Sequence, residues 1–230
     1  MKKIQCLSLL ALGLVLLIPF GSSDALAQRG GGGGGGLAAP IEVSVTYGSM
    51  WGGNVGTRLG KLRLGTGASY GFAVDIPLQP TMAVELSYTR QDGSLDYDSS
   101  GRITTLTDMS VNYWQIGAVK GMVMGKVRPF FTTGLGATYY SPKASEVTIE
   151  EETFDVSSNT KFSLVIGAGF KAYFGKSEKI GLRASIKTFP TLYNTGGGVW
   201  FGSGGASVGL TGDAIWQWEA AAGLTVKFGG

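Results

Sequence analysis

The stretch WQWEAAAGLTVKF, residues 216–228, alternates with a period of two residues along its whole length. Large or apolar groups fall on one face: Trp216, Trp218, Ala220, Ala222, Leu224, Val226 and Phe228. Small or polar groups dominate the other, among them Gln217, Glu219, Gly223, Thr225 and Lys227. Because successive side chains of a β-strand point to opposite faces, this pattern predicts a strand, and one longer than the roughly 5–6 residues usual in soluble proteins.

The same alternation recurs upstream, and no segment from residue 41 onward shows the 3.6-residue stripe of a helix. Eight alternating runs can be collected: 41–52, 64–77, 81–91, 110–123, 127–140, 160–174, 179–189 and 214–228. Each is long enough to cross a bilayer, which takes about 9–11 residues of a tilted strand. Bacterial transmembrane barrels have an even number of antiparallel strands, and eight satisfies that condition.

The links between these runs alternate strictly in length. Short links follow the second, fourth and sixth runs, around 78–80, 124–126 and 175–178. Long links, polar or rich in Gly, follow the others, at 53–63, 92–109, 141–159 and 190–213. All short turns then lie at one end and all long loops at the other, as in outer-membrane barrels, whereas a soluble sandwich has no reason to sort its links. We therefore expect an all-β fold, an eight-stranded antiparallel up-and-down transmembrane β-barrel.

Composition agrees with a lipid-facing surface. Only 15% of the 230 residues are charged, against about 25% in ordinary soluble domains. Aromatic residues of the apolar faces fall into two groups. One group lies near the long links, namely Trp51, Tyr88, Trp114, Tyr139, Phe162 and Trp216, and the other near the short links, namely Phe131, Phe170, Phe174 and Phe228. Two aromatic belts at headgroup depth are typical of membrane-spanning barrels.

The segment before the first run predicts export. Residues 1–27 combine Lys2-Lys3, an apolar core and the cleavage pattern Ala25-Leu26-Ala27, as in a secretory signal peptide. The apolar run is shorter than the roughly 18 residues of a spanning helix, which disfavours a membrane anchor. Residues 28–40 contain seven consecutive glycines and are expected to form a flexible tail. Residues 41–230 remain as the barrel domain.

Inward positions of the predicted strands combine glycine with charge. Charged side chains expected inside are Glu42, Asp75, Glu85, Arg128, Lys161, Lys171, Arg183, Lys187, Glu219 and Lys227. An eight-stranded barrel is filled by its side chains, and unpaired buried charge is costly, so we expect a lumen ion-pair network. Its predicted members are Glu85, Arg183, Lys187, Glu219, Lys171 and Lys227. Glu85 and Arg183 lie on opposite strands at similar height and are predicted to pair, while a polar pathway or binding site is the alternative.

Several chemistries have little support in this composition. The chain has no His, which excludes Ser-His-Asp hydrolysis and a His general base. Its one Cys, Cys6, lies in the predicted signal, so we expect no disulfide and no Cys metal site. A formal net charge of +3 is too small and dispersed for nucleic-acid binding. We expect no catalytic residue, no cofactor and no metal.

The chain from about residue 41 to its end resembles the eight-stranded bacterial outer-membrane barrel family, which includes the OmpA-like transmembrane domain and OmpX- and OmpW-type proteins. The resemblance lies in GASYGFAVDIPL (67–78), VELSY (84–88), IGAVKG (116–121), RPFFTTGLGATYY (128–140), SLVIGAGFKAYF (163–174) and AAAGLTVKF (220–228). The last strand resembles the assembly signal of such barrels, with Gly223, Val226 and Phe228 as its elements. It departs from that signal in Ala221, where a polar residue is usual, and in the two glycines after Phe228.

The resemblance implies an integral protein of the Gram-negative outer membrane, in contact with lipid and lipopolysaccharide and handled by the barrel-assembly machinery. Barrel enzymes of this kind use a His, so we expect no enzymatic activity. Val199, Trp200 and Phe201 lie at the centre of the last long link, where they could contact a host or surface ligand or instead plug the barrel mouth. The leading functional hypothesis is envelope integrity or surface interaction through the loops. A narrow porin-like channel for small or hydrophobic solutes is the alternative.

Overall fold

A computed structural model of the chain describes residues 40–56, 61–99, 101–122, 125–144, 146–149, 152–155, 157–193, 196–202, 205–211 and 214–229. The predicted signal peptide and nearly all of the predicted tail, residues 1–39, lie outside these ranges. Every described element is a strand. Among the described residues there is no helix long and apolar enough to cross a membrane.

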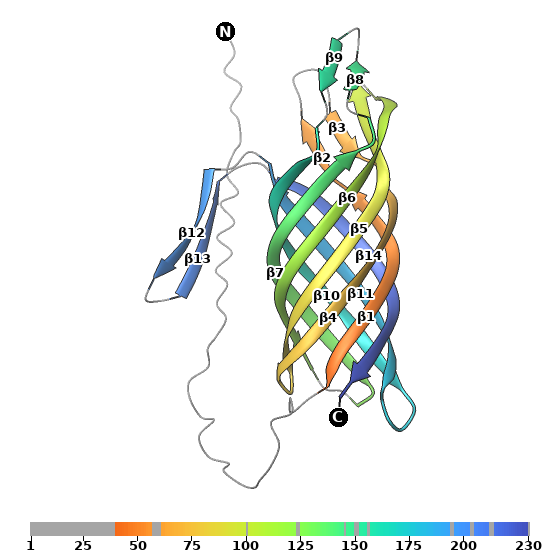
Figure 1. The fold of residues 1–230 in the computed structure, drawn as a ribbon, viewed down its shortest axis with the longest axis vertical. Coiled ribbons are helices and arrows are strands. Elements are labelled where there is room, and N and C mark those ends of the chain that lie inside the picture. The colour runs from red at the N-terminus through yellow and green to blue at the C-terminus, as the bar shows by residue number, and fades with distance from the viewer. Residues whose placement is uncertain are drawn as a thin grey trace. The chain divides into compact units, whose positions relative to one another are not determined.

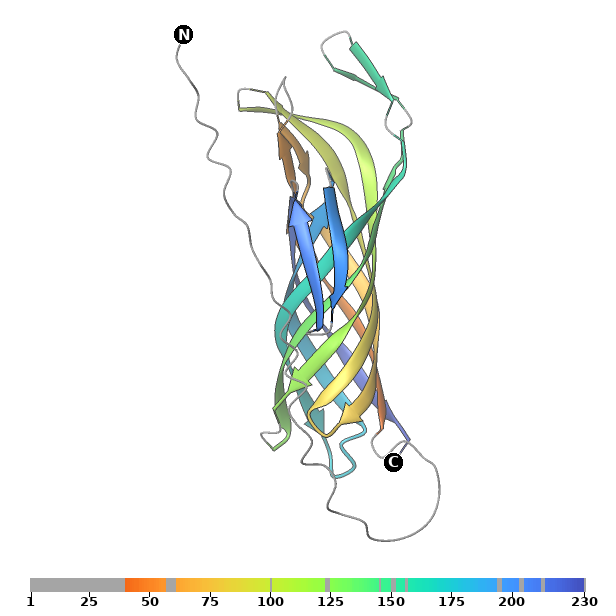
Figure 2. The ribbon, with the colours of Figure 1, turned by 90° about the vertical axis from the view of Figure 1, so that its left-hand side faces the viewer.

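Eight long antiparallel strands form a closed ring (Figures 1 and 2). In ring order they are β1 (Ile41–Gly52), β4 (Gly67–Gln79), β5 (Met82–Ser99), β6 (Arg102–Gly121), β7 (Val127–Pro142), β10 (Asn159–Phe174), β11 (Ile180–Leu192) and β14 (Ala214–Phe228). The ring closes where β14 pairs with β1, from Ile41 opposite Phe228 to Gly52 opposite Gln217. The predicted fold class, an eight-stranded up-and-down barrel, is confirmed.

The two predicted faces of each strand are separated in space. In β14 the outward side chains include Trp216, Trp218 and Leu224, which are 43%, 43% and 56% exposed. Gln217 and Glu219, at the alternate positions, are 0% and 2% exposed inside the barrel. A continuous apolar outer surface of this kind is not tolerated by a soluble monomer, but it is what a strand facing lipid requires.

The short links gather at one end of the barrel, together with the C-terminal end of β14 (Figure 1). Gly125 and Gly175 sit in two of these turns with φ of 63° and 72°, a left-handed conformation that glycine adopts without steric cost. The opposite end carries short extra strands, β2 (Asn54–Gly56), β3 (Lys61–Leu64), β8 (Glu146–Ile149) and β9 (Glu152–Asp155). We call the two ends the short-turn end and the long-loop end.

The long links contain more strand than the sequence predicts. β5 and β6 continue to Ser99 and from Arg102, although residues 92–109 are expected as a loop. A bulge at Leu106 of β6, opposite Leu95 and Asp96 of β5, shifts the pairing by one residue and interrupts the period of two on β6. β3 pairs with β5 above the end of β4 and so extends the barrel wall.

β12 (Gly196–Gly202) and β13 (Gly205–Thr211) form a separate two-stranded hairpin within the last long link. This hairpin belongs to a different compact unit from the barrel. Val199, Trp200 and Phe201 occupy successive positions of β12, opposite Val208, Ser207 and Ala206. Their side chains are outside the part of the chain whose packing is described.

Candidate functional site

A layer of buried ionic side chains crosses the lumen near the short-turn end. Arg183 of β11 bonds to Glu85 of β5, and its Nη1 lies 3.3 Å from Oδ2 of Asp75 on β4. Lys187 lies four residues after Arg183 on the same face of β11, and its Nζ is 3.3 Å from Oε1 of Glu85. Lys171 of β10 bonds to both Asp75 and Glu42. We call the group Glu42, Asp75, Glu85, Lys171, Arg183 and Lys187 the ionic layer.

The ionic layer joins opposite walls of the barrel. Its acids come from three consecutive strands of the ring, β1, β4 and β5, whereas its cations come from β10 and β11. The Arg183 and Glu85 side chains are 1% and 2% exposed, and the Asp75 side chain is 3% exposed. Charges this deeply buried persist only when paired, so each wall supplies the counter-charge for the other.

Aromatic packing supports the cations of the ionic layer. The Phe130 ring of β7 lies with its centroid 4.7 Å from Cζ of Arg183 and 5.8 Å from Nζ of Lys171. Gly169 faces Phe130, and a Cβ at that position would come within 2.7 Å of the ring. Glycine therefore makes room for a larger inward side chain here, as the inward glycines of the predicted strands imply.

Lys227 and Arg128 form a second, outer group at the mouth of the short-turn end. Oε2 of Glu178 accepts a hydrogen bond from Nη2 of Arg128 at 2.8 Å and lies 3.7 Å from Nζ of Lys227. Both cations stack on the ring of Tyr173, at 4.8 and 3.5 Å from its centroid. The Tyr173 hydroxyl donates to Oε1 of Glu42 at 2.6 Å, which links this mouth group to the ionic layer.

The structure therefore distributes the predicted network residues over two groups. Glu85, Arg183, Lys187 and Lys171 come together, while Lys227 belongs to the mouth group. Glu219 is 2% exposed and lies beside Lys187 in the strand register, but its Oε1 has no hydrogen-bond partner in the described part of the chain.

At the ionic layer, two acids and one aromatic residue stand outside the predicted network, although inward parity in the sequence could have indicated each of them. Asp75 and Glu42 were expected inside the barrel without a role in the network, and the alternation of β7 places Phe130 on the inner face. The acidic and basic side chains of the two groups, with Glu219, are equal in number: Glu42, Asp75, Glu85, Glu178 and Glu219 against Arg128, Lys171, Arg183, Lys187 and Lys227.

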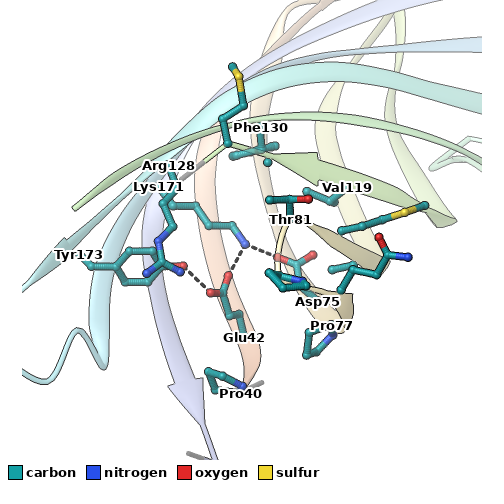
Figure 3. Close-up of a pocket in the computed structure, with 16 residues that line it drawn as sticks. Pro40, Glu42, Asp75, Pro77, Thr81, Val119, Arg128, Phe130, Lys171 and Tyr173 are labelled. Carbon is teal, nitrogen blue, oxygen red and sulfur yellow. Dashed lines mark hydrogen bonds and ion pairs between the residues drawn. The ribbon is translucent and has the colours of Figure 1, made fainter. Parts of the chain in front are cut away.

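A pocket of about 130 Å³ opens at the short-turn end below the ionic layer (Figure 3). Its polar wall includes Glu42, Asp75 and Lys171, whose ammonium lies between the two carboxylates. Apolar groups such as Pro77 and Phe130 complete the lining. The pocket is bounded on its inner side by paired charges, so it is a recess in the barrel mouth.

Apolar side chains pack together in the long-loop half of the lumen, beside buried polar residues such as Gln91 and Gln217. A buried cluster contains Met50, Leu95, Met109, Val111, Tyr113, Val165 and Phe189. The rings of Tyr113 and Phe189 pack with centroids 4.4 Å apart. We call this set the apolar cluster.

Amide side chains lie beside the apolar cluster. The Tyr113 hydroxyl donates to Gln217, and Gln217 Nε2 donates to Oε1 of Gln91 at 2.5 Å. Gln91 in turn donates to the carbonyl of Gly65 at 2.9 Å. These bonds connect β6, β14 and β5 to the chain segment that follows β3, across the interior of the barrel.

The residues of the predicted assembly signal lie in the closing strand. Gly223 faces inward, opposite Thr46 of β1 and Arg183 of β11. Val226 and Phe228 face outward, and Phe228 is 56% exposed at the last ladder position, opposite Ile41. Recognition of this strand by an assembly machinery stays a prediction.

Comparison with solved structures identifies the same fold. The chain is similar to Neisserial surface protein A, with 16% identity and a TM-score of 0.51, over 82% of this chain and 97% of that one. It is also similar to the outer membrane protein OprG from Pseudomonas aeruginosa, with 12% identity and a TM-score of 0.57, over 84% and 98%. Neither a protein-family model nor a curated protein sequence matches the chain. At these identities the likeness establishes the outer-membrane barrel fold.

Proposed function

We propose that this chain is an integral, non-enzymatic protein of the Gram-negative outer membrane that acts through its long-loop end. The observation that carries the proposal is the filled lumen. The ionic layer joins opposite walls at one height and the apolar cluster fills the interior at another. A barrel filled at two heights has its accessible surfaces on the outside and at its ends, and the longer links lie at the long-loop end.

Three observations support the membrane location. The outward faces are apolar and exposed, as with Val45 at 64% and Tyr47 at 67%. The two solved structures described above share the fold, and one of them is the outer membrane protein OprG. The start of the sequence fits a signal for export into the periplasm.

The partners proposed for this function are the lipid and lipopolysaccharide around the barrel, the barrel-assembly machinery during insertion, and a surface ligand of the loops. Val199, Trp200 and Phe201 in the β12–β13 hairpin are the proposed contact residues. A Trp-Phe pair in an otherwise small, Gly-rich segment offers the kind of apolar anchor that interfaces use.

Cell fractionation with heated and unheated gel samples tests the location. We expect the full chain in the outer-membrane fraction, with a mobility that changes on boiling because the folded barrel resists detergent. Recovery in the periplasmic fraction without detergent, and no change on boiling, would refute the membrane assignment.

Replacement of residues 194–213 by a short turn tests the role of the hairpin. We expect the heat-dependent mobility to persist, because the hairpin forms a unit separate from the barrel. In a strain that lacks the gene, we expect the wild-type chain to restore deoxycholate resistance and this variant to fail to restore it. Replacement of residues 146–155 is the matched control, and full resistance with the 194–213 variant would contradict the proposed role.

A further inference from the structure

Four exposed lysines lie on the rim of the short-turn end. Lys120 is at the end of β6 on the outward face, and Lys126 lies in the turn before β7. Lys176 and Lys179 lie in the turn between β10 and β11. All four belong to one arc of the ring, from β6 through β7 and β10 to β11. The turn between β4 and β5 carries no charged residue at positions 78–82.

Backbone hydrogen bonds hold the lysine positions in place. The carbonyl of Lys126 accepts from the amide of Tyr173 on β10 at 2.9 Å. The carbonyl of Lys179 accepts from the amide of Lys227 on β14 at 2.8 Å. The turns are thereby tied to neighbouring strands, so the charges are presented at fixed points of the rim and only the side chains remain to be ordered by a ligand.

The positive charge of this rim is not neutralised within the described structure. Glu178 is the acidic residue of the Lys176–Lys179 turn, and it is engaged by Arg128 and Lys227. None of the four lysines has an ion-pair partner among the described residues of the barrel. The opposite end differs in sign, since the four long links carry ten acidic and five basic residues.

The surroundings of the lysines place them at a lipid interface. Lys120 lies beside the outward-facing Phe131 in the strand register, and Phe131 is 50% exposed. Phe174 and Ile180, 52% and 54% exposed, flank the turn that carries Lys176 and Lys179. Exposed aromatic and apolar groups of this kind lie at the membrane interface, and a lysine beside them can extend its ammonium to the lipid headgroups.

We propose that this lysine arc binds the headgroups of anionic phospholipids in the leaflet at the short-turn end. The ligand class is a lipid with a net negative phosphodiester headgroup, such as phosphatidylglycerol. This inference rests on the proposed membrane function. A lipid surface is favoured over a soluble acidic polymer because Lys120 faces outward, beside apolar groups that need lipid.

Electron spin resonance of spin-labelled lipids in reconstituted vesicles tests the proposal. The full chain is placed in phosphatidylcholine vesicles, and motionally restricted label is compared for phosphatidylglycerol and phosphatidylcholine probes. We expect about five-fold selectivity for the anionic probe, because a lysine near an anionic headgroup contributes about 1 kcal/mol. The selectivity should fall steeply at about 1 M salt, where the Debye length is roughly 3 Å.

The decisive variant is Lys120→Gln/Lys126→Gln/Lys176→Gln/Lys179→Gln, which should bring the selectivity close to one. The corresponding variant with four Arg keeps the charge and should keep the selectivity, while Lys61→Gln/Arg102→Gln at the long-loop end should leave it unchanged.

Equal binding of both probes by the wild-type chain, or full selectivity in the Gln variant, overturns the proposal. Loss of sedimentation with isolated peptidoglycan in the Gln variant, without lipid selectivity in the wild type, overturns it in favour of an acidic polymer. Absence of any restricted lipid signal refutes the membrane function itself.

Discussion

The ionic layer and the apolar cluster fill the same lumen by different physical means. In the ionic layer, strands far apart in the ring supply opposite charges that must meet, as when Arg183 reaches Glu85. In the apolar cluster, side chains such as Met50 and Phe189 need only volume and contact. Removing one member of a charge pair leaves a buried charge, whereas removing one apolar group leaves a cavity. The two ends should therefore respond differently to substitution.

The largest effect is expected for Arg183→Met. The substitution leaves Glu85 and Asp75 without the cation between them, and breaking a buried pair in this way costs roughly 3–5 kcal/mol. Guanidinium unfolding of the reconstituted barrel measures the change. Glu85→Met alone and Glu85→Met/Arg183→Met complete a double-mutant cycle, and the double variant should cost clearly less than the sum of the two single variants. Additive costs would contradict the pairing as the source of the effect.

The next effect is expected for Met50→Ala in the apolar cluster. Met50 is 0% exposed, and truncation of a fully buried Met leaves a cavity that costs about 3 kcal/mol. The same unfolding experiment measures this loss. Met50→Leu nearly conserves volume and should cost less than about 1.5 kcal/mol. An Ala variant with wild-type stability would mean that this end of the lumen is loosely packed.

A smaller effect is expected for Tyr113→Phe, within the apolar cluster. The ring contact with Phe189 remains, but Gln217 loses the hydroxyl that donates to it. Loss of one partner of a buried hydrogen bond costs about 1–3 kcal/mol. Tyr139→Phe, on the exposed outer face, is the control and should change the unfolding midpoint little. A midpoint shift as large for the control as for Tyr113→Phe would argue against the internal bond.

The smallest effect is expected for Lys143→Gln, which breaks an ion pair outside the lumen. Lys143 and Asp108 are 2.9 Å apart, but their side chains are 72% and 63% exposed. Exposed pairs of this kind contribute about 0–1 kcal/mol, so the unfolding free energy should barely change. An effect comparable to that of Arg183→Met would remove burial as the explanation for the importance of the ionic layer.

The strands of the ring could be predicted from the period-two alternation, because it indicates both where each strand lies and which of its residues share a face. Glu85 and Arg183 could be matched across the lumen because the eight-strand ring places β5 and β11 opposite each other. The role of Asp75 was harder to predict. Asp75 and Glu85 are neighbours in the strand register, and nothing in the local sequence indicates that Arg183 lies beside both carboxylates. The position of Lys227 at the mouth depends on Glu178, a turn residue with a φ of 46° that no alternation reveals.

The apolar cluster was not predicted at all. Its members, such as Met50 and Val111, lie on the inner faces, where the prediction considered the glycine and charged residues. Leu95 continues the inward alternation of β5, but it lies in the segment 92–109, which was assigned to a loop, and the extra residue of the bulge, Leu106, lies on the facing strand β6. Alternation distinguishes the two faces of a strand, but the choice between ionic and apolar filling depends on which inward residues share a height, and the strand register determines that.

Single-channel recording in planar bilayers shows whether the ionic layer and the apolar cluster close the lumen. The purified full-length chain, shown to be folded by its heat-dependent mobility, is added to a bilayer in about 1 M potassium chloride. Because the lumen is filled, we expect no discrete openings for the wild-type chain under a steady voltage. Regular openings of uniform size from the wild-type chain would contradict it and would favour the narrow channel instead.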